Sequence, residues 1–195
     1  MSSPDFASAG MLRLIQLGLQ RQGLAVPALP ALDSAHVALA DKRALAAALW
    51  QAHGPEVLLR IGAAVQGEIG GAAPLQALML ARDPLDLLQR WQRLERFIHS
   101  RHRVRLLGAE PGLLRLQHVS LRAEAPPSAA EDLLIFGLLV ALAVRIGSGG
   151  LQARLADDGD WRWQGGQWRP LDWPGDCSRW VIAWQGLVTK PAPAE

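Results

Sequence analysis

Histidine pairs are the first feature of this sequence that could do chemistry. His99 and His102 stand three residues apart, and imidazoles at that spacing on a helix can share one metal ion. His102, however, falls where a predicted helix passes into a predicted strand, and no convincing third ligand is evident nearby. We therefore predict no metal site, and the sequence gives no sign of another cofactor.

Glu95 and His99 are four residues apart, near the apolar stripe of the same predicted helix as Trp91. A buried polar pair beside an indole can hydrogen-bond a ligand inside an apolar pocket. Simple pairing on the helix surface is the alternative interpretation. We predict Trp91, Glu95 and His99 as candidates for the wall of a ligand pocket.

Other chemistry-bearing residues lack the neighbours that their reactions require. Cys177 has no base beside it in the sequence. The glycines of residues 62–71 lack the lysine and hydroxyl residue that end a P-loop. The aspartates of residues 157–160 lack the remaining ligands of a calcium loop. No catalytic signature appears elsewhere, so we predict that the chain is not an enzyme.

Tryptophan is concentrated near the C-terminus. Exposed indoles can stack on sugars or bases, whereas indoles on one strand face more commonly pack in a core or an interface. Alternate positions place Trp161 with Trp163 on one such face, and Trp180 lies near Trp184 on another. Six of the eight tryptophans belong to this segment: Trp161, Trp163, Trp168, Trp173, Trp180 and Trp184.

The elements that must position these residues follow from hydrophobic periodicity. Residues 83–119 predict an amphipathic helix, with Asp83 and Pro84 at its start, followed by a β-hairpin. Asp41 is the expected N-cap of an earlier helix, and Ser128 or Glu131 starts the most apolar one. Further helices are expected over 11–22, 42–52, 56–64, 74–81 and 133–146, and strands near 151–155, 160–163, 167–171 and 179–184.

Composition bounds the class of protein. The chain has 195 residues, half of them hydrophobic, which fits one globular domain or one domain with an appended subdomain. The formal net charge of +2 says little about partners. We predict an α+β fold, with a helical N-terminal half packed on an antiparallel sheet that the Trp-rich C-terminal strands complete. The domain is expected to span residues 1–188, and residues 189–195 are expected to form a flexible tail or linker.

Location is suggested by two features. The most apolar run, residues 133–146, is shorter than the roughly 20 residues that span a bilayer, so we predict a core helix and no membrane association. A single cysteine and the lack of a recognisable signal peptide predict a reducing cytoplasm.

Three stretches resemble the arabinose-binding-like N-terminal effector domain of AraC-type transcription regulators. The first is residues 44–66, with a leucine-arginine-aliphatic-glycine pattern at Leu59 to Gly62. The second is residues 67–107, a glycine-containing loop, a short helix, a longer basic helix and a strand. The third is the apolar helix of residues 133–146, which follows the hairpin.

The resemblance implies a non-enzymatic ligand-sensing or regulatory domain that takes a small-molecule effector or a regulator protein as partner and forms a homodimer. Such regulators carry two helix-turn-helix units in a further domain, which this sequence lacks, and the basic run of residues 101–105 is too short to replace them. We therefore expect no direct DNA binding. The alternatives are a stand-alone protein–protein interaction module, as an anti-activator or adaptor, and a carbohydrate or nucleotide binder that uses the tryptophans.

Overall fold

The computed structural model describes residues 5–28, 34–64, 73–156, 159–170 and 175–187. It confirms the predicted α+β class, with N-terminal helices packed on an antiparallel sheet and tryptophans gathered in the C-terminal strands. The proposed tail, residues 189–195, lies outside the described residues, and the assignment of 1–188 to one domain remains a prediction.

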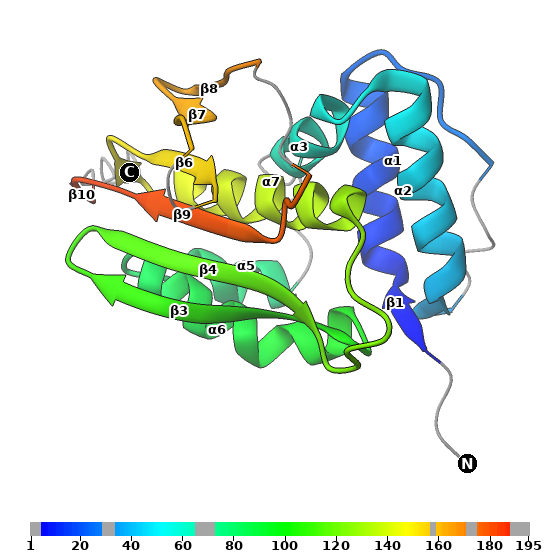
Figure 1. Cartoon of the computed structure of the whole chain (residues 1–195), viewed down its shortest axis with the longest axis horizontal. Coiled ribbons are helices and arrows are strands. Elements are labelled where there is room, and N and C mark those ends of the chain that lie inside the picture. The colour runs from blue at the N-terminus through cyan, green and yellow to red at the C-terminus, as the bar shows by residue number, and fades with distance from the viewer. Residues whose placement is uncertain (1–4, 29–33, 65–72, 157–158, 171–174, 188–195) are drawn as a thin grey trace, which may run out of the picture.

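Residues 5–28 and 34–64 form a helical lobe (Figure 1). A short antiparallel pair, β1 and β2, holds the starts of two helices side by side. The expected N-cap at Asp41 is wrong: the second helix begins two residues earlier, at Leu39, whose N–H is bonded to the carbonyl of Asp5 at 3.3 Å. A backbone partner thus replaces the side-chain cap that the sequence suggested. The elements are β1 (Phe6–Ser8), α1 (Ala9–Arg21), β2 (His36–Ala38), α2 (Leu39–His53) and α3 (Glu56–Ala63).

Residues 73–156, 159–170 and 175–187 form a sheet lobe. Six antiparallel strands lie in the order β3-β4-β9-β6-β7-β8, and β5 pairs separately with β10. Helices α6 and α7 pack on the inner face of β4 and β9. The elements are α5 (Ala73–Met79), α6 (Pro84–Ile98), β3 (His102–Glu110), β4 (Leu113–Ser120), α7 (Ala129–Arg145), β5 (Ser148–Gly149), β6 (Gln152–Leu155), β7 (Trp163–Gln164), β8 (Gln167–Trp168), β9 (Arg179–Ala183) and β10 (Gly186–Leu187).

Side-chain caps fix the starts of the two helices nearest the candidate site. The Asp83 carboxylate accepts the N–H of Asp86 at 2.8 Å, which confirms the predicted start of α6. Ser128 caps α7, and the Glu131 side chain bonds back to the Ser128 N–H, so these residues form a capping box. The sequence predicted that Ser128 or Glu131 starts this helix. In the structure Ser128 is the N-cap, and Glu131 is its partner in the capping box.

Helix α7 connects the two lobes (Figure 1). Its glycine Gly137 crosses Gly62 of α3 so closely that a Cβ on either residue would overlap the backbone of the other helix. Gly18 of α1 meets Ile61 in the same way, at 2.8 Å from an added Cβ to the Ile61 Cα. Small residues at these three positions let the helices pack with their backbones in contact. We call this the glycine seam.

The tryptophans fall into two environments. Trp180 is fully buried and stacks on Phe136 of α7, with ring centroids 5.4 Å apart. Trp163 and Trp168 meet edge to face at 5.2 Å and pack on the rim of the same core. Trp161 is only partly buried, and the Arg154 guanidinium lies 4.8 Å from its ring centre. Core packing therefore accounts for most of this cluster. Among the described helices, none has the length and hydropathy needed to cross a bilayer.

Candidate functional site

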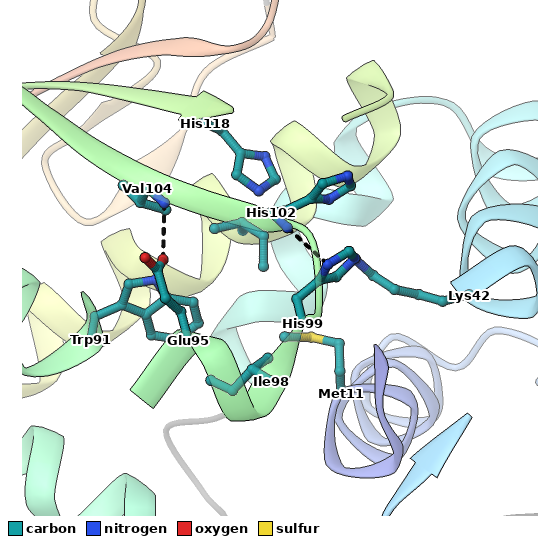
Figure 2. Close-up of a pocket in the computed structure, with 10 residues that line it drawn as sticks. Met11, Lys42, Trp91, Glu95, Ile98, His99, His102, Val104 and His118 are labelled. Atoms are coloured by element: carbon teal, nitrogen blue, oxygen red, sulfur yellow. Dashed lines mark hydrogen bonds between the residues drawn. The ribbon is translucent and has the colours of Figure 1, made fainter. Parts of the chain in front are cut away.

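The predicted pocket residues meet where the two lobes join. Trp91, Glu95 and His99 all border one internal cavity of about 20 Å³ (Figure 2), which is room for about one water molecule. Whether these residues bind a ligand remains a prediction. The rest of the lining comes from α1, α2, the end of α6, the start of β3, β4 and α7: Met11, Lys42, Ile98, His102, Val104, His118 and Ile135.

Glu95 contacts the free edge of the sheet at Val104 of β3. Its Oε2 accepts the indole N–H of Trp91 at 3.1 Å and the backbone N–H of Val104 at 2.9 Å (Figure 2). Gln92 donates to the carbonyl of Val104 at 2.9 Å, so α6 satisfies both backbone groups of this edge residue. Burial raises the pKa of Glu95 to about 7, although the donated hydrogen bonds oppose that rise.

His99 ends α6 and shapes the corner that leads into β3. Its Nδ1 accepts the backbone N–H groups of Arg101 and His102, at 3.2 and 3.1 Å. A neutral imidazole has one lone pair, so the proton of this ring lies on Nε2. The His102 ring stacks on it with centroids 3.9 Å apart. Burial lowers the pKa of His99 to about 4 and that of His102 to about 2, so both rings are neutral at pH 7.

Glu131 is the centre of the polar contacts at this junction. Its side chain is fully buried, yet Lys42 Nζ lies 3.2 Å from Oε1 and Arg43 Nε lies 3.0 Å from Oε2. His99 Nε2 and His102 Nδ1 lie 3.9 and 3.7 Å from Oε1, just beyond hydrogen-bonding distance. These five residues, which we call the Glu131 cluster, join α2 of the helical lobe to α6, β3 and α7 of the sheet lobe.

The charges of the Glu131 cluster compensate one another. Burial alone would raise the pKa of Glu131, but the His99 imidazole and the Lys42 ammonium hold it below its ordinary value. Burial lowers the pKa of Lys42, and the Glu131 carboxylate opposes that change. Three ring nitrogens, His99 Nε2 and both nitrogens of His102, have no hydrogen-bond partner among the described residues. The cluster is therefore ionic at its centre and incompletely satisfied at its edge.

Glu131 supplies the third metal-ligand type that the sequence did not reveal near His99 and His102. One donor atom from each of the three residues lies within 4.8 Å of the others. However, His99 uses its lone pair to accept two backbone N–H groups, and its Nε2 carries a proton rather than a lone pair. Lys42 also occupies Glu131 Oε1. In this arrangement Lys42 and Arg43 donate to the Glu131 carboxylate and His99 turns a protonated nitrogen toward it, so His99 and Glu131 do not offer free ligand atoms to a metal.

His118 separates the internal cavity from an outer hollow of about 350 Å³ beside β4. Its Nδ1 lies 2.8 Å from Asp132 Oδ1, and its ring packs edge-on against His102 at 5.2 Å. Cys177 borders the same hollow but is fully buried, and burial raises the pKa of its thiol to about 11. A thiol in that state is a poor nucleophile, in agreement with the sequence-based interpretation of Cys177.

The fold resembles solved H-NOX structures. The Fe(II) unliganded H-NOX protein from K. algicida aligns over 94% of this chain and 100% of its own, with a TM-score of 0.59 and 13% identity. A structure from a study of heme distortion in the H-NOX family covers 94% and 90%, with a TM-score of 0.51 and 11% identity. Another, from work on heme redox potential and porphyrin distortion, covers 95% of both chains, with a TM-score of 0.52 and 11% identity. At these identities the likeness establishes the fold alone.

These comparisons correct the AraC assignment. No family model matches the sequence, and no curated protein does either, while the solved structures that share this arrangement of elements include H-NOX proteins. The resemblance rested on the order of helices, hairpin and apolar helix and on no diagnostic motif. Because the same order of elements fits the H-NOX fold, it was not specific evidence for an AraC-type effector domain or for the functions that such a domain implies.

Proposed function

We propose that this chain is a non-enzymatic sensor domain in which a small molecule acts at the junction between the two lobes. The observation that carries the proposal is the Glu131 cluster: a fully buried carboxylate of α7 held by two cations of α2. Beside it lie a small cavity and three ring nitrogens with no partner among the described residues. The H-NOX-like fold supports a sensor, since H-NOX denotes heme nitric oxide/oxygen binding.

The site works by a shift between closed and open lobes. A cavity of about 20 Å³ admits nothing larger than about one water molecule, so a larger ligand binds only when the lobes separate near Glu131. Opening stretches the contacts of Lys42 and Arg43 with that carboxylate. A ligand that binds the open state shifts the population toward it, and its apparent affinity depends on how often that state forms. Trp91, Glu95 and His99 then form the exposed wall.

A protein partner would respond to this change by binding at the surface of the domain. Leu106 and Leu107 are 39% and 51% exposed on β3, which is an edge strand of the six-stranded sheet. Exposed apolar side chains on a sheet edge favour pairing with another chain, and we propose a second copy of this chain in a reducing cytoplasm. Sedimentation velocity at rising concentration tests this part of the proposal: a dimer supports it, and a monomer throughout contradicts it.

Thermal-shift measurements test the sensor proposal. The purified chain is screened against amino acids, nucleotides, sugars, zinc and hemin, in wild type and in Arg43→Met. We expect one class of compound to raise the Tm saturably and to bind more tightly to Arg43→Met, because this substitution weakens the closed state. Arg60→Met is the matched control, since the ion pair of Arg60 with Glu56 lies on the exposed face of α3, away from the Glu131 cluster.

Two outcomes would contradict the sensor proposal. The first is the lack of a saturable shift with every compound. The second is a shift that Arg43→Met and Arg60→Met change equally, because binding would then be independent of the Glu131 cluster.

A further inference from the structure

We infer that this chain has the H-NOX fold without heme, and that the Glu131 cluster joins the lobes where no room for a porphyrin exists. The inference rests on the proposed function only in treating the junction as the responsive part of the molecule. Four observations about the described residues carry it: the space in the interior, the glycine seam, the state of the histidines and the charges at the junction.

The interior space is far too small for a porphyrin. The junction cavity measures about 20 Å³, and a second internal cavity between α6, α7, β4 and β9 measures about 10 Å³. Pockets that bury organic ligands of this size class occupy about 300–1,000 Å³. Two hollows of about 350 Å³ do exist, one beside β4 and one beside β7, but both are open on the surface and would leave much of a macrocycle in water.

The glycine seam holds the lobes together beside the junction. A Cβ on Gly137 would overlap the backbone of Leu59, and a Cβ on Gly62 would overlap that of Leu138. Helices in backbone contact leave no gap into which a flat cofactor could slide. Opening the lobes widely enough for a porphyrin would therefore disrupt packing between α3 and α7 as well as the polar contacts at Glu131.

None of the five histidines, all of which are described, offers an iron ligand facing a large space. The Nδ1 lone pair of His99 accepts hydrogen bonds from two backbone N–H groups. His102 is enclosed between the rings of His99 and His118. His118 is bound to Asp132 through Nδ1. His36 and His53 are exposed on the helical lobe and border neither internal cavity.

The charges at the junction oppose insertion of an apolar macrocycle. Lys42 is 1% exposed and Glu131 is fully buried, and each depends on the other for compensation. Separating such a pair inside an apolar site leaves two desolvated charges, which is strongly unfavourable. Charged and aromatic side chains thus fill the junction between the lobes around the small cavity.

Hemin titration of the intact chain, in the ferric and the dithionite-reduced states, tests the inference. We expect no saturable Soret band, and any weak absorbance change should be the same in wild type, His102→Ala, His99→Ala and the control His53→Ala. A saturable 1:1 band that His102→Ala or His99→Ala abolishes, and that His53→Ala retains, would overturn it. Circular dichroism establishes that each variant is folded, and His102→Gln or His99→Gln replaces an alanine variant that fails to fold.

The result separates this inference from the proposed function. Specific heme binding would overturn the heme-free inference and leave a sensor domain in place. The lack of both heme binding and a stabilising compound in the thermal-shift panel would overturn the sensor proposal and leave the heme-free inference intact.

Discussion

The middle and the N-terminal end of α7 meet the helical lobe in opposite ways. At Gly137 the contact is apolar, and backbone packs on backbone with no room for a methyl group. At Glu131, about two turns earlier in the helix, the contact is ionic and borders a cavity with unpartnered nitrogens. One contact fixes the relative position of the lobes, and the other can change with small movements of side chains.

This difference suggests why a charged cluster is retained inside the molecule. Well-packed apolar residues often stabilise a core as well as a buried ion pair does, because removing charges from water is costly. The glycine seam already provides such packing. We therefore interpret the Glu131 cluster as a switching element, a role that buried polar groups can serve when they have two arrangements.

The largest expected effect comes from Glu131→Gln. The substitution leaves Lys42 buried without its carboxylate, and breaking a buried pair in this way costs about 3–5 kcal/mol in the free energy of unfolding. Urea denaturation of wild type and variant measures it. Glu56→Gln, in an exposed pair on α3, is the control and should cost at most about 1 kcal/mol. Equal effects in the two variants would contradict a special role for Glu131.

Gly137→Ala has the next largest expected effect on stability. The new methyl group would overlap the backbone of Leu59, and overpacking of this kind costs about 2–3 kcal/mol despite the better helix propensity of alanine. Gly175→Ala is matched to it, because an added Cβ at Gly175 meets nothing within 4 Å. A change at Gly137 no larger than that at Gly175 in thermal unfolding would mean that the glycine seam is looser than described.

Glu95 predicts a pH dependence. Burial raises its pKa from 4.5 to about 7, so between these values the folded chain keeps a proton that the unfolded chain has released. Its contribution to stability is therefore complete below about pH 4.5 and is lost as the pH rises to about 7. Glu95→Gln removes this titration and should reduce the loss of stability between pH 5.5 and 7 by about 1–2 kcal/mol.

Urea denaturation at several pH values compares Glu95→Gln with Glu124→Gln, whose carboxyl is exposed in the β4–α7 connection. A wild-type slope that both variants preserve would show that Glu95 is ionised throughout this range.

Ser128→Ala gives the smallest effect. It removes the N-cap of α7 and one contact of the Glu131 carboxylate, and loss of an N-cap costs about 1 kcal/mol. Thermal unfolding measures the change in Tm. An effect as large as that of Glu131→Gln would mean that the capping box, rather than the pair with Lys42, holds the carboxylate in place.

The sequence predicted the start of a helix well where a capping residue marks it. The Asp83 cap of α6 and the Ser128 cap of α7 are both present. The i,i+4 spacing placed Glu95 and His99 near one another, and both border the predicted cavity. Helix α1 also has a side-chain cap, because Ser8 Oγ accepts the N–H of Gly10 at 3.1 Å. The start of α2 has no such cap and depends instead on pairing between β1 and β2. These two three-residue strands are too short to show a periodicity of their own, so they could not be predicted from the sequence.

The centre of the site could not be predicted from the sequence. Lys42 lies in a helix with ordinary charged neighbours, so its local sequence does not indicate that it is buried. Its partner in the fold, Glu131, stands 89 residues later. The capping box identified Glu131 as a residue at the start of a helix. No local sequence feature indicated that its carboxylate also pairs with Lys42 and Arg43 of α2. The H-NOX-like fold was missed for a related reason, because the resemblance used in its place rested on the order of elements, and 13% identity to the solved structure left little sequence signal for this fold.

A double-mutant cycle on Lys42 and Glu131 tests the central claim most directly. The free energies of unfolding of wild type, Lys42→Met, Glu131→Gln and the double variant give the coupling between the two side chains. If this pair joins the lobes, each single substitution is strongly destabilising, the double variant recovers much of the loss, and the coupling energy is about 2 kcal/mol or more. Additive effects, with a coupling energy near zero, would contradict the account.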